Sequence, residues 1–543
     1  MKKTLFNIAI VAAALCASFT SCKKDILDEV VYSKMTEDIA FTTGENAQAA
    51  VDAMYITLHS LYREPMWMLN DTPTDVAWRS YCTEWLNDEA AKTDNIIAGC
   101  YEWFTTIYAR ANTVLDNIPD MNDNLFGDKG VETKEEMLAE AHFMRAYAYY
   151  ELTDIYYQVP LVTTSNVNVS EPITFSPIAD IETVIETDLK AAAEGLPKTR
   201  ANEQAQRPTY GAAEAFLVRL YMRQAGRARL AGNAGVATEK WNAALTEVNK
   251  VLALEDEGVY SLKDDVWEVF DPSTDESLYN NELIWAVRAS RKSTQGSWDL
   301  GLMCTPWELD MGWSCYHNSL ELYWMFDPED TRLTKLFVTQ YQNIYGDSDY
   351  YYAPASIDEI GKVPEVVKAK VGEFDTINEN DFISSQKYKF LYPWEYNYDT
   401  PNNFPIARLS DMILCKAEIL NELDRAGEAL PFVNRIRERA FGNDNHNISE
   451  TNKEALRSLI CDERAFELNG EAMRRPDLIR MGLWKDRMDK YIESKKQIAH
   501  WTAINNPNIS EEEALGTYKT YPKDLTDNDI RRYWPIPFRE VEI

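Results

Sequence analysis

Positive charge is scarce in this sequence. Lys and Arg total 55 against 88 Asp and Glu, so the formal net charge is -33 and the pI is near 4.6. Nucleic acids and anionic lipids are bound through concentrated basic faces. The composition therefore excludes nucleic acid as an expected partner and disfavours a direct electrostatic contact with lipid headgroups. Neutral ligands such as sugars remain compatible with an acidic surface, because stacking and hydrogen bonds bind them.

Motifs of common metal and nucleotide sites are also missing. No cysteine pair has CxxC spacing, and there is no glycine-rich phosphate loop. The Asp-rich turn "DMNDNLFGD" at 120–128 could hold a structural calcium ion, although its spacing is not that of an EF-hand. We expect no cofactor, with structural calcium left open. The 5 histidines show neither metal-ligand spacing nor a triad pattern: His59, His142, His317, His446 and His500.

The N-terminus has the composition of an export signal. Lys2 and Lys3 precede an apolar run from Leu5 to Leu15 that is too short to span a bilayer, and "FTSC" ending at Cys22 is similar to a bacterial lipobox. We expect residues 1–21 to be a lipoprotein signal peptide and Cys22 to be lipidated, which would anchor the protein to a membrane. The alternative is ordinary cleavage that releases a soluble exported protein.

The remaining cysteines give no unique pairing. Export permits disulfides, and Cys304 with Cys315 could close an aromatic stretch. Cys415 and Cys461 lie in helical patterns and are expected to be small buried hydrophobic residues.

Apolar residues recur at three- and four-residue spacing in two parts of the chain, about 40–257 and 406–485. Thr133 and Glu136 predict a capping box at the start of one helix with a single apolar face, and Gly226 predicts the end of another. Antiparallel helix pairs with short turns are the units of helical-repeat proteins, so we predict a mainly α fold on a tetratricopeptide-like scaffold. The predicted helices are 133–157, 208–225, 239–254, 406–423 and 428–440.

The segment from about 258 to 405 differs in composition. Gly, Pro, Tyr, Trp, Asn and Asp dominate it, and long periodic runs are few. We predict a loop-rich insertion carried by the helical scaffold, within a single domain of residues 22–543. Binding residues are found disproportionately on such loops.

Aromatic residues gather in "WDLGLMCTPWELDMGWSCYH" at 298–317, which has neither a helical nor a strand-like period. Such rings form either the core of an irregular subdomain or a surface that contacts a flat ligand. Tryptophan is highly buried on average, which favours the core. A sugar ring, however, shows a face of C–H groups that packs on an aromatic plane, while its edge leaves hydroxyls for polar side chains.

Several stretches, in this order, resemble the SusD/RagB family of surface lipoproteins. They follow the lipoprotein signal and reach the C-terminus: "EWFTTIYARANTVLDNIP" at 102–119, "AEAHFMRAYAYYELTDIYYQVPLV" at 139–162, "PTYGAAEAFLVRLYM" at 208–222, "RLSDMILCKAEILNEL" at 408–423, "ERAFELNGEAMRRPDLIRMG" at 463–482 and "RRYWPIPFREV" at 531–541. Together they cover nearly the whole mature chain.

The resemblance implies a SusD-like fold and a role outside catalysis. It implies tetratricopeptide-like helix pairs that support an irregular ligand-binding half, and a SusC-like TonB-dependent transporter that the lipoprotein covers as a lid. Proteins of this kind sit on the outer membrane, facing outward, and deliver captured oligosaccharide or polysaccharide to the transporter. They are not enzymes.

The resemblance also places ligand-facing loops in two segments. It favours glycan contact for at least two residues of the aromatic stretch, while Trp324 on the following helix is expected in the core. The candidates there are Trp298, Trp307, Trp313 and Tyr316. The candidates in "NDTPTDVAWRSYCTEW" at 70–85 are Trp78, as a stacking ring, with Asp71, Asp75 and Arg79 as hydrogen-bonding partners. The other reading of the second segment is a loop whose carboxylates cap the next helix and whose tryptophan anchors the loop.

A charged set near the C-terminus could suggest acid–base catalysis. Its helical spacing indicates instead ion pairs that join helices. The set comprises Glu463, Glu467, Glu471, Arg474, Asp477, Arg480, Arg437 and Arg439.

The sequence thus predicts a surface glycan-binding lipoprotein that works with a SusC-like importer. Two other classes remain open. One is an exported all-helical glycan-degrading enzyme, either a lyase or a hydrolase. The other is a scaffold that binds only another protein. The sugar is not identified, and peptide cargo is also open.

Overall fold

A computed structural model describes most of the chain, including both helical parts and much of the segment between them. The expected signal peptide, the lipidation site Cys22, Cys82 and Trp298 lie outside the described residues. The described ranges are 41–79, 94–128, 130–167, 174–273, 279–289, 300–310, 312–343, 349–370, 376–379, 382–388, 401–505, 510 and 533–537.

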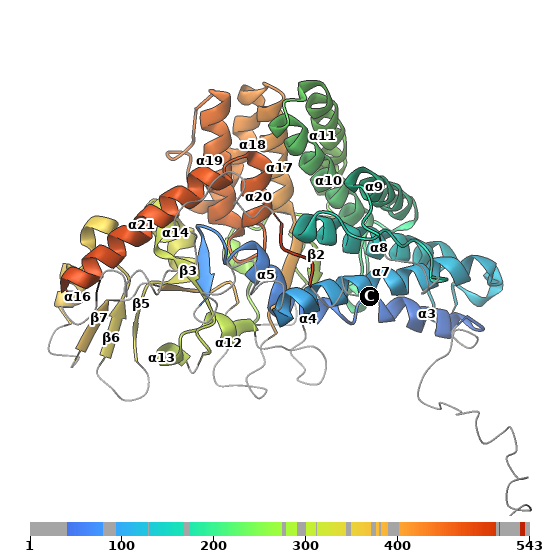
Figure 1. The fold of residues 1–543 in the computed structure, drawn as a ribbon, viewed down its shortest axis with the longest axis horizontal. Helices are drawn as coiled ribbons and strands as arrows, with labels where there is room; N and C mark the ends of the chain where they lie inside the picture. Colours follow the sequence, from blue (N-terminus) through green and yellow to red (C-terminus); the bar gives the residue numbers. More distant parts are fainter. Residues whose placement is uncertain are drawn as a thin grey trace, which may run out of the picture.

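Helix pairs form one continuous scaffold. The N-terminal helices pack in sequence order, α7 on α8, α8 on α9 and α10 on α11, and α11 also packs on α17 of the C-terminal group. Figure 1 shows α17 to α20 beside α10 and α11 in the upper part of the molecule, with α7, α3 and α4 lower down on the right. The N-terminal helices are α3 (Gly44–Ala53), α4 (Leu58–Arg63), α5 (Pro65–Asn70), α7 (Asn95–Asn117), α8 (Lys134–Tyr156), α9 (Ile178–Gly195), α10 (Tyr210–Leu230) and α11 (Ala234–Asp256). The C-terminal helices are α17 (Leu409–Glu422), α18 (Ala426–Phe441), α19 (Lys453–Leu468), α20 (Arg474–Met481) and α21 (Trp484–Asn505).

The sequence predicts where α8 starts, but it does not predict how far the helix is buried. The capping box is confirmed, because the Glu136 N–H donates to Thr133 Oγ1 and the Thr133 N–H donates to Glu136 Oε2, both at 3.1 Å. The predicted single apolar face is wrong, since every residue from Phe143 to Tyr156 is buried. A helix enclosed by neighbours on several sides buries its whole circumference.

The end of α10 also differs from the prediction. The helix continues past Gly226 to Leu230. A Cβ at Gly226 would lie 2.7 Å from the Arg480 carbonyl oxygen, so this glycine permits close packing of α20 against α10 and does not end the helix.

The segment predicted as loop-rich contains only short elements. Its strands, together with β1 from the N-terminal part of the chain, form small sheets of order β1-β3-β8-β4, β2-β9 and β5-β6-β7. Among the described strands only the β6–β7 pair is parallel. The strands are β1 (Ala77–Arg79), β2 (Leu283–Val287), β3 (Tyr316–Ser319), β4 (Phe337–Val338), β5 (Gln340–Gln342), β6 (Asp349–Tyr352), β7 (Thr376–Glu379), β8 (Phe382–Ser385) and β9 (Phe404–Arg408). The short helices are α12 (Leu300–Cys304), α13 (Trp307–Asp310), α14 (Leu320–Met325), α15 (Thr331–Leu336) and α16 (Glu365–Lys368). The 3-10 turns are η2 (Ile118–Asp120), η3 (Asp123–Leu125), η4 (Asn202–Gln204), η5 (Val266–Val269) and η7 (Ile357–Glu359).

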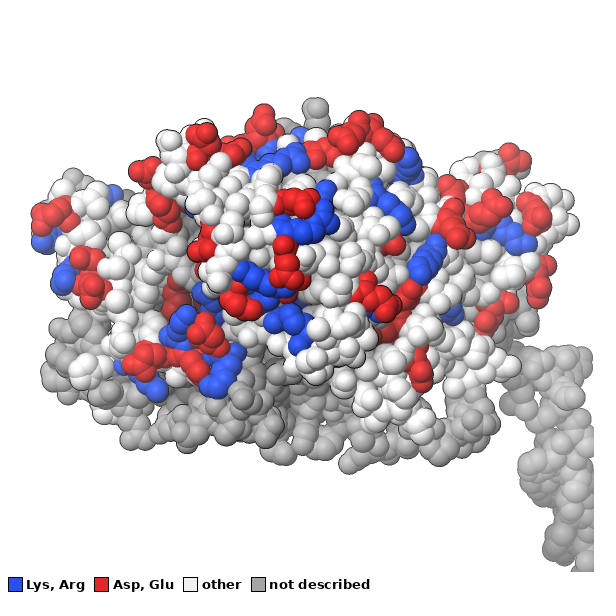
Figure 2. All heavy atoms as spheres, turned by 90° about the horizontal axis from the view of Figure 1, so that it is seen from above, with Lys and Arg blue, Asp and Glu red and all other residues white. Residues whose placement is uncertain are grey.

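The predicted ion pairs between helices are confirmed. Arg437 pairs with Glu463 at 2.9 Å, Arg439 pairs with Glu467, and Arg480 of α20 pairs with Glu418 of α17 at 2.7 Å. Most of these side chains are buried, so the carboxylates are held in internal salt bridges rather than facing a cleft. On the face shown in Figure 2, acidic and basic side chains lie interspersed over the helices.

No helix within the described ranges is long and apolar enough to cross a membrane.

Candidate functional site

The fold brings the two predicted ligand-facing segments together. Strand β1 pairs antiparallel with β3, so that Trp78 lies opposite His317 and Arg79 lies opposite Tyr316. Ser319 Oγ also donates to the Asp75 carbonyl oxygen at 2.6 Å, across 244 positions of sequence. Adjacent strands lie about 4.8 Å apart, so the two segments form one local surface.

Two of the predicted rings are exposed. Trp307, at the start of α13, has 52% of its surface exposed, and Trp313, in the turn before β3, has 42%. In Figure 1, α12 and α13 lie along the lower edge, below the C-terminal helices α17 to α20. Tryptophan side chains are usually well buried, so two exposed rings six positions apart favour a contact surface.

Backbone hydrogen bonds hold the segment that carries these rings. The Trp313 N–H donates to the Leu302 carbonyl at 2.7 Å, and the Cys315 N–H donates to the Met303 carbonyl at 2.9 Å. Gly312 permits the close approach, because a Cβ there would lie 1.8 Å from the Thr305 carbonyl oxygen. The rings are therefore presented from a fixed backbone.

Tyr316 does not share this exposure. Its side chain is 1% exposed and packs edge-on against Trp67, with ring centroids 4.9 Å apart. Its place inside the sheet turns the ring into the core, and we remove Tyr316 from the ligand-contacting set. Cys304 and Cys315 are not joined to each other, so the disulfide left open from the sequence is not formed. Trp324 is partly buried against the core, as expected.

The side chains of Asp71 and Asp75 are also buried in the interior. Asp71 is fully buried and accepts hydrogen bonds from the N–H groups of Ala472 (2.8 Å) and Arg474 (3.1 Å), and burial raises its pKa to about 7. Asp75 accepts a two-pronged contact from the Arg474 guanidinium at 2.7 and 2.6 Å. Asp71 thus binds backbone N–H groups at the start of α20, about 400 positions away, whereas Asp75 forms an ion pair with a side chain. Neither contact is the predicted cap on the next helix. We remove both residues from the ligand-contacting set.

No observation tests ligand contact for the remaining candidates, Trp78, Arg79 and Trp298. The backbone of Trp78 and Arg79 is placed in β1 beside β3, and contact with a ligand stays a prediction for both. Trp298 stays a prediction outside the described residues.

A tyrosine pair next to the loop was missed from the sequence. Tyr341 on β5 and Tyr351 on β6 are register partners whose rings stack at 5.1 Å, and α13 packs against β5. Tyr351 is half-buried. The run of tyrosines in "DSDYYY" could have indicated a strand, but the packing of β5 against α13 depends on the tertiary fold.

His317 lies beneath the loop and should make stability depend on pH. The neutral ring donates from Nε2 to the Ser314 carbonyl at 2.9 Å, and burial lowers its pKa from 6.5 to about 4. The unfolded chain takes up a proton between these pH values while the folded chain does not, so the folded state loses stability as pH falls from 6.5 to 4. The loss should approach about 3 kcal/mol.

The matched variant for this test is His317→Gln, which keeps a donor but does not titrate. Urea unfolding at pH 7.5 and 4.5 should show the wild type losing about 2–3 kcal/mol relative to the variant. Parallel behaviour of the two proteins would show that His317 is not held neutral.

No group of three His, Cys, Asp or Glu suited to a metal ion occurs in the part of the chain that the structure describes. The question of a structural calcium ion at 120–128 rests on the sequence alone.

Scaffold and site define a class of protein in which helix pairs carry an irregular half with exposed aromatic residues. A family model described as "SusD family" matches residues 281–542, and one described as "Starch-binding associating with outer membrane" matches residues 25–222. The chain belongs to the SusD/RagB family.

Individual relatives are distant in sequence. SusD-like protein P25 of Formosa agariphila is 26% identical over 408 residues, which cover 70% of this chain and 69% of that protein. A SusD homolog from Bacteroides thetaiotaomicron has a TM-score of 0.70 at 19% identity and covers 93% of this chain and 96% of its own. A laminarin-binding SusD-like protein has a TM-score of 0.63 at 20% identity, with coverage of 92% and 97%. The structural matches establish the fold.

Proposed function

We propose that this protein is a cell-surface lipoprotein that captures an oligosaccharide or polysaccharide and passes it to a SusC-like TonB-dependent transporter. The observation that carries the proposal is the pair of exposed rings, Trp307 and Trp313, on a backbone fixed by hydrogen bonds. The family membership gives the context, and the two rings give the chemistry.

Aromatic planes suit sugars for a physical reason. The C–H face of a pyranose packs on the ring, which removes apolar surface from water, while the sugar hydroxyls stay hydrogen-bonded at the edge. A loop already fixed in position loses little conformational entropy on binding, so more of the contact energy is realised as affinity. Strand β5, which packs against α13, carries Tyr341, whose ring stacks on Tyr351.

Relatives support a carbohydrate ligand. One structural relative is named as laminarin-binding, and one matching family model is described as starch-binding. The present chain need not share either sugar, because specificity depends on loop geometry rather than on the fold.

The anchor and the location rest on the N-terminus and the family. The predicted signal peptide with Cys22 would attach the mature chain to the outer membrane by its lipid, and the second family model is described as associating with the outer membrane. The transporter partner and the outward orientation follow from the family resemblance.

A binding role without catalysis agrees with the placement of the acidic residues. Glu463, Glu467 and Glu471 are buried in salt bridges with arginine or lysine side chains. Carboxylates used in glycoside cleavage must instead flank a bound substrate.

A glycan array tests the proposal. Residues 23–543 should bind one class of glycan, and Trp313→Ala should weaken that binding while leaving the unfolding temperature unchanged. Failure of the folded protein to bind any glycan would contradict the proposal. Release of cleaved products would support the exported enzyme, and transporter binding without sugar affinity would support the scaffold class.

A further inference from the structure

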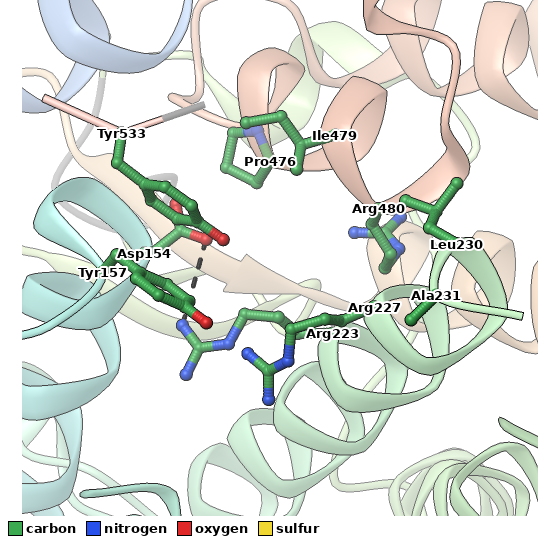
Figure 3. Close-up of a pocket in the computed structure, with 10 residues that line it drawn as sticks. All are labelled: Asp154, Tyr157, Arg223, Arg227, Leu230, Ala231, Pro476, Ile479, Arg480 and Tyr533. Carbon is green, nitrogen blue, oxygen red and sulfur yellow. Dashed lines mark ion pairs between the residues drawn. The ribbon is translucent and has the colours of Figure 1, made fainter. Parts of the chain in front are cut away.

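A cavity of about 350 Å³ opens where four segments of the chain meet. Its walls come from the ends of α8 and α10, from α20, and from the C-terminal segment at Tyr533 (Figure 3). The volume lies within the range of about 300–1,000 Å³ that small-molecule sites occupy. In Figure 1, α10 and α20 lie in the upper part and α13 lies along the lower edge, so the cavity is separate from the tryptophan loop.

The walls of the cavity are fixed independently of any ligand. Gly226 brings α10 against the Arg480 backbone, and the Arg480 guanidinium makes a two-pronged contact with Glu418 at 2.8 and 2.7 Å. On the opposite side, the Trp534 N–H donates to the Ile155 carbonyl at 2.7 Å, which holds the neighbouring Tyr533 in place. A preformed cavity keeps the ordering cost of binding low.

Tyr157 enters the cavity from a strained backbone. Its φ of 71° and ψ of -75°, with the Gln158 N–H bonded to the Tyr156 carbonyl at 3.0 Å, form a classical γ-turn, which is rare for residues other than glycine. The turn places the Tyr157 ring against Tyr533, with centroids 4.5 Å apart. Strain of this kind concentrates at functional sites.

The chemistry of the lining favours an anion. The lining contains three arginines and one aspartate, but Arg480 is already paired with two buried carboxylates, which leaves Arg223 and Arg227 as the cations that could meet a ligand. Figure 3 shows the guanidinium groups of Arg223 and Arg227 on the same side as the hydroxyl of Tyr157. Glu182 lies behind both arginines and partly compensates them, yet Arg227 keeps 34% of its side chain exposed. A guanidinium presents five N–H donors in a planar fork that matches a carboxylate.

The rest of the lining suits a sugar ring. Leu230, which is 42% exposed, and Ile479 provide apolar surface for C–H groups at the other end of the cavity. Asp154 can accept hydrogen bonds from ring hydroxyls, although it also lies 3.9 Å from Arg223. A compact ring with one carboxylate matches this combination of donors, acceptor and apolar wall.

We propose that this cavity binds a hexuronate unit, with its carboxylate on Arg227 and Arg223. The site is additional to the tryptophan loop and does not depend on the function proposed for that loop. The cavity would give the protein affinity for an acidic sugar. The exposed rings contact C–H faces and cannot distinguish an acidic sugar from a neutral one.

Calorimetric titration of residues 23–543 tests the proposal with D-galacturonate and D-glucuronate. At least one should bind ten-fold or more tightly than the matching neutral hexose and than the methyl ester of galacturonate, since both lack the charge. Acetate should not compete. Equal binding of uronate and neutral hexose, no uronate binding, or equal binding of acetate would each overturn the proposal.

Three variants locate the site. Arg227→Met should weaken uronate binding at least ten-fold, and Tyr157→Phe, which removes only a hydroxyl, should weaken it several-fold. The double variant Trp307→Ala/Trp313→Ala should bind uronate like the wild type. If Arg227→Met does not fold, Tyr157→Phe decides. Unchanged binding in folded Arg227→Met, or loss of binding in the tryptophan variant, would place the uronate elsewhere and overturn the assignment.

Discussion

Replacing both exposed rings, Trp307→Ala with Trp313→Ala, is expected to lower glycan affinity at least 100-fold. A bound sugar would cover about 60–100 Å² of apolar surface on each ring, which is worth about 1.5–2.5 kcal/mol. Each single variant should therefore bind about 10- to 50-fold more weakly. Calorimetry with the glycan identified on the array measures all three variants.

The control is Phe175→Ala. Phe175 is also an exposed aromatic residue, 50% exposed, and it precedes α9 on the scaffold. This variant should bind the glycan like the wild type. Because Trp307 and Trp313 protrude, their variants should unfold at the wild-type temperature. Full glycan affinity in the double variant would show that the rings serve another surface, such as the transporter interface.

Breaking the buried charge cluster around Arg408 is expected to cost about 3–5 kcal/mol of unfolding free energy. Arg408 is 1% exposed and contacts Glu282 at 2.8 Å, Glu467 at 2.5 Å and Glu471 at 2.7 Å. Burial alone would raise the pKa of Glu467, yet Arg439 and Arg408 hold it well below its ordinary value. Arg408→Met leaves these buried carboxylates short of one cation, and urea denaturation measures the loss.

The matched control for this experiment is Arg425→Met. Arg425 pairs with Glu428 at 2.6 Å, but both side chains are exposed, so this variant should keep the wild-type midpoint. A midpoint for Arg408→Met equal to that of Arg425→Met would mean that the cluster relaxes or takes up protons at little cost. Glycan binding should survive in both variants at temperatures where they are folded.

Helices and their starts were predictable because their signals are local. The capping box of Thr133 and Glu136 lies within four residues, and the 3.6-residue period of α17 and α18 lies within each segment. Gly226 was misinterpreted for the opposite reason, since its role depends on α20, which follows more than 200 residues later.

The candidate site was only partly predictable. Trp307, Trp313 and Tyr316 share one short stretch of sequence, yet two are exposed and one is buried. A stretch without a period carries no information about which side chain faces inward. Burial there is set by the pairing of β3 with β1 and by the packing of Trp67.

The sequence by itself determined the acidic composition, the helical scaffold and the ordered motifs that identify the family. Tertiary structure alone decided that Asp71 and Asp75 contact the start of α20. It also decided that Arg408 pairs with three carboxylates and that four segments line the cavity at Tyr157. The physical reason is the distance along the chain over which each effect acts. Propensity, capping and periodicity act within a few residues, whereas burial and ion pairing depend on which distant segments the fold brings into contact.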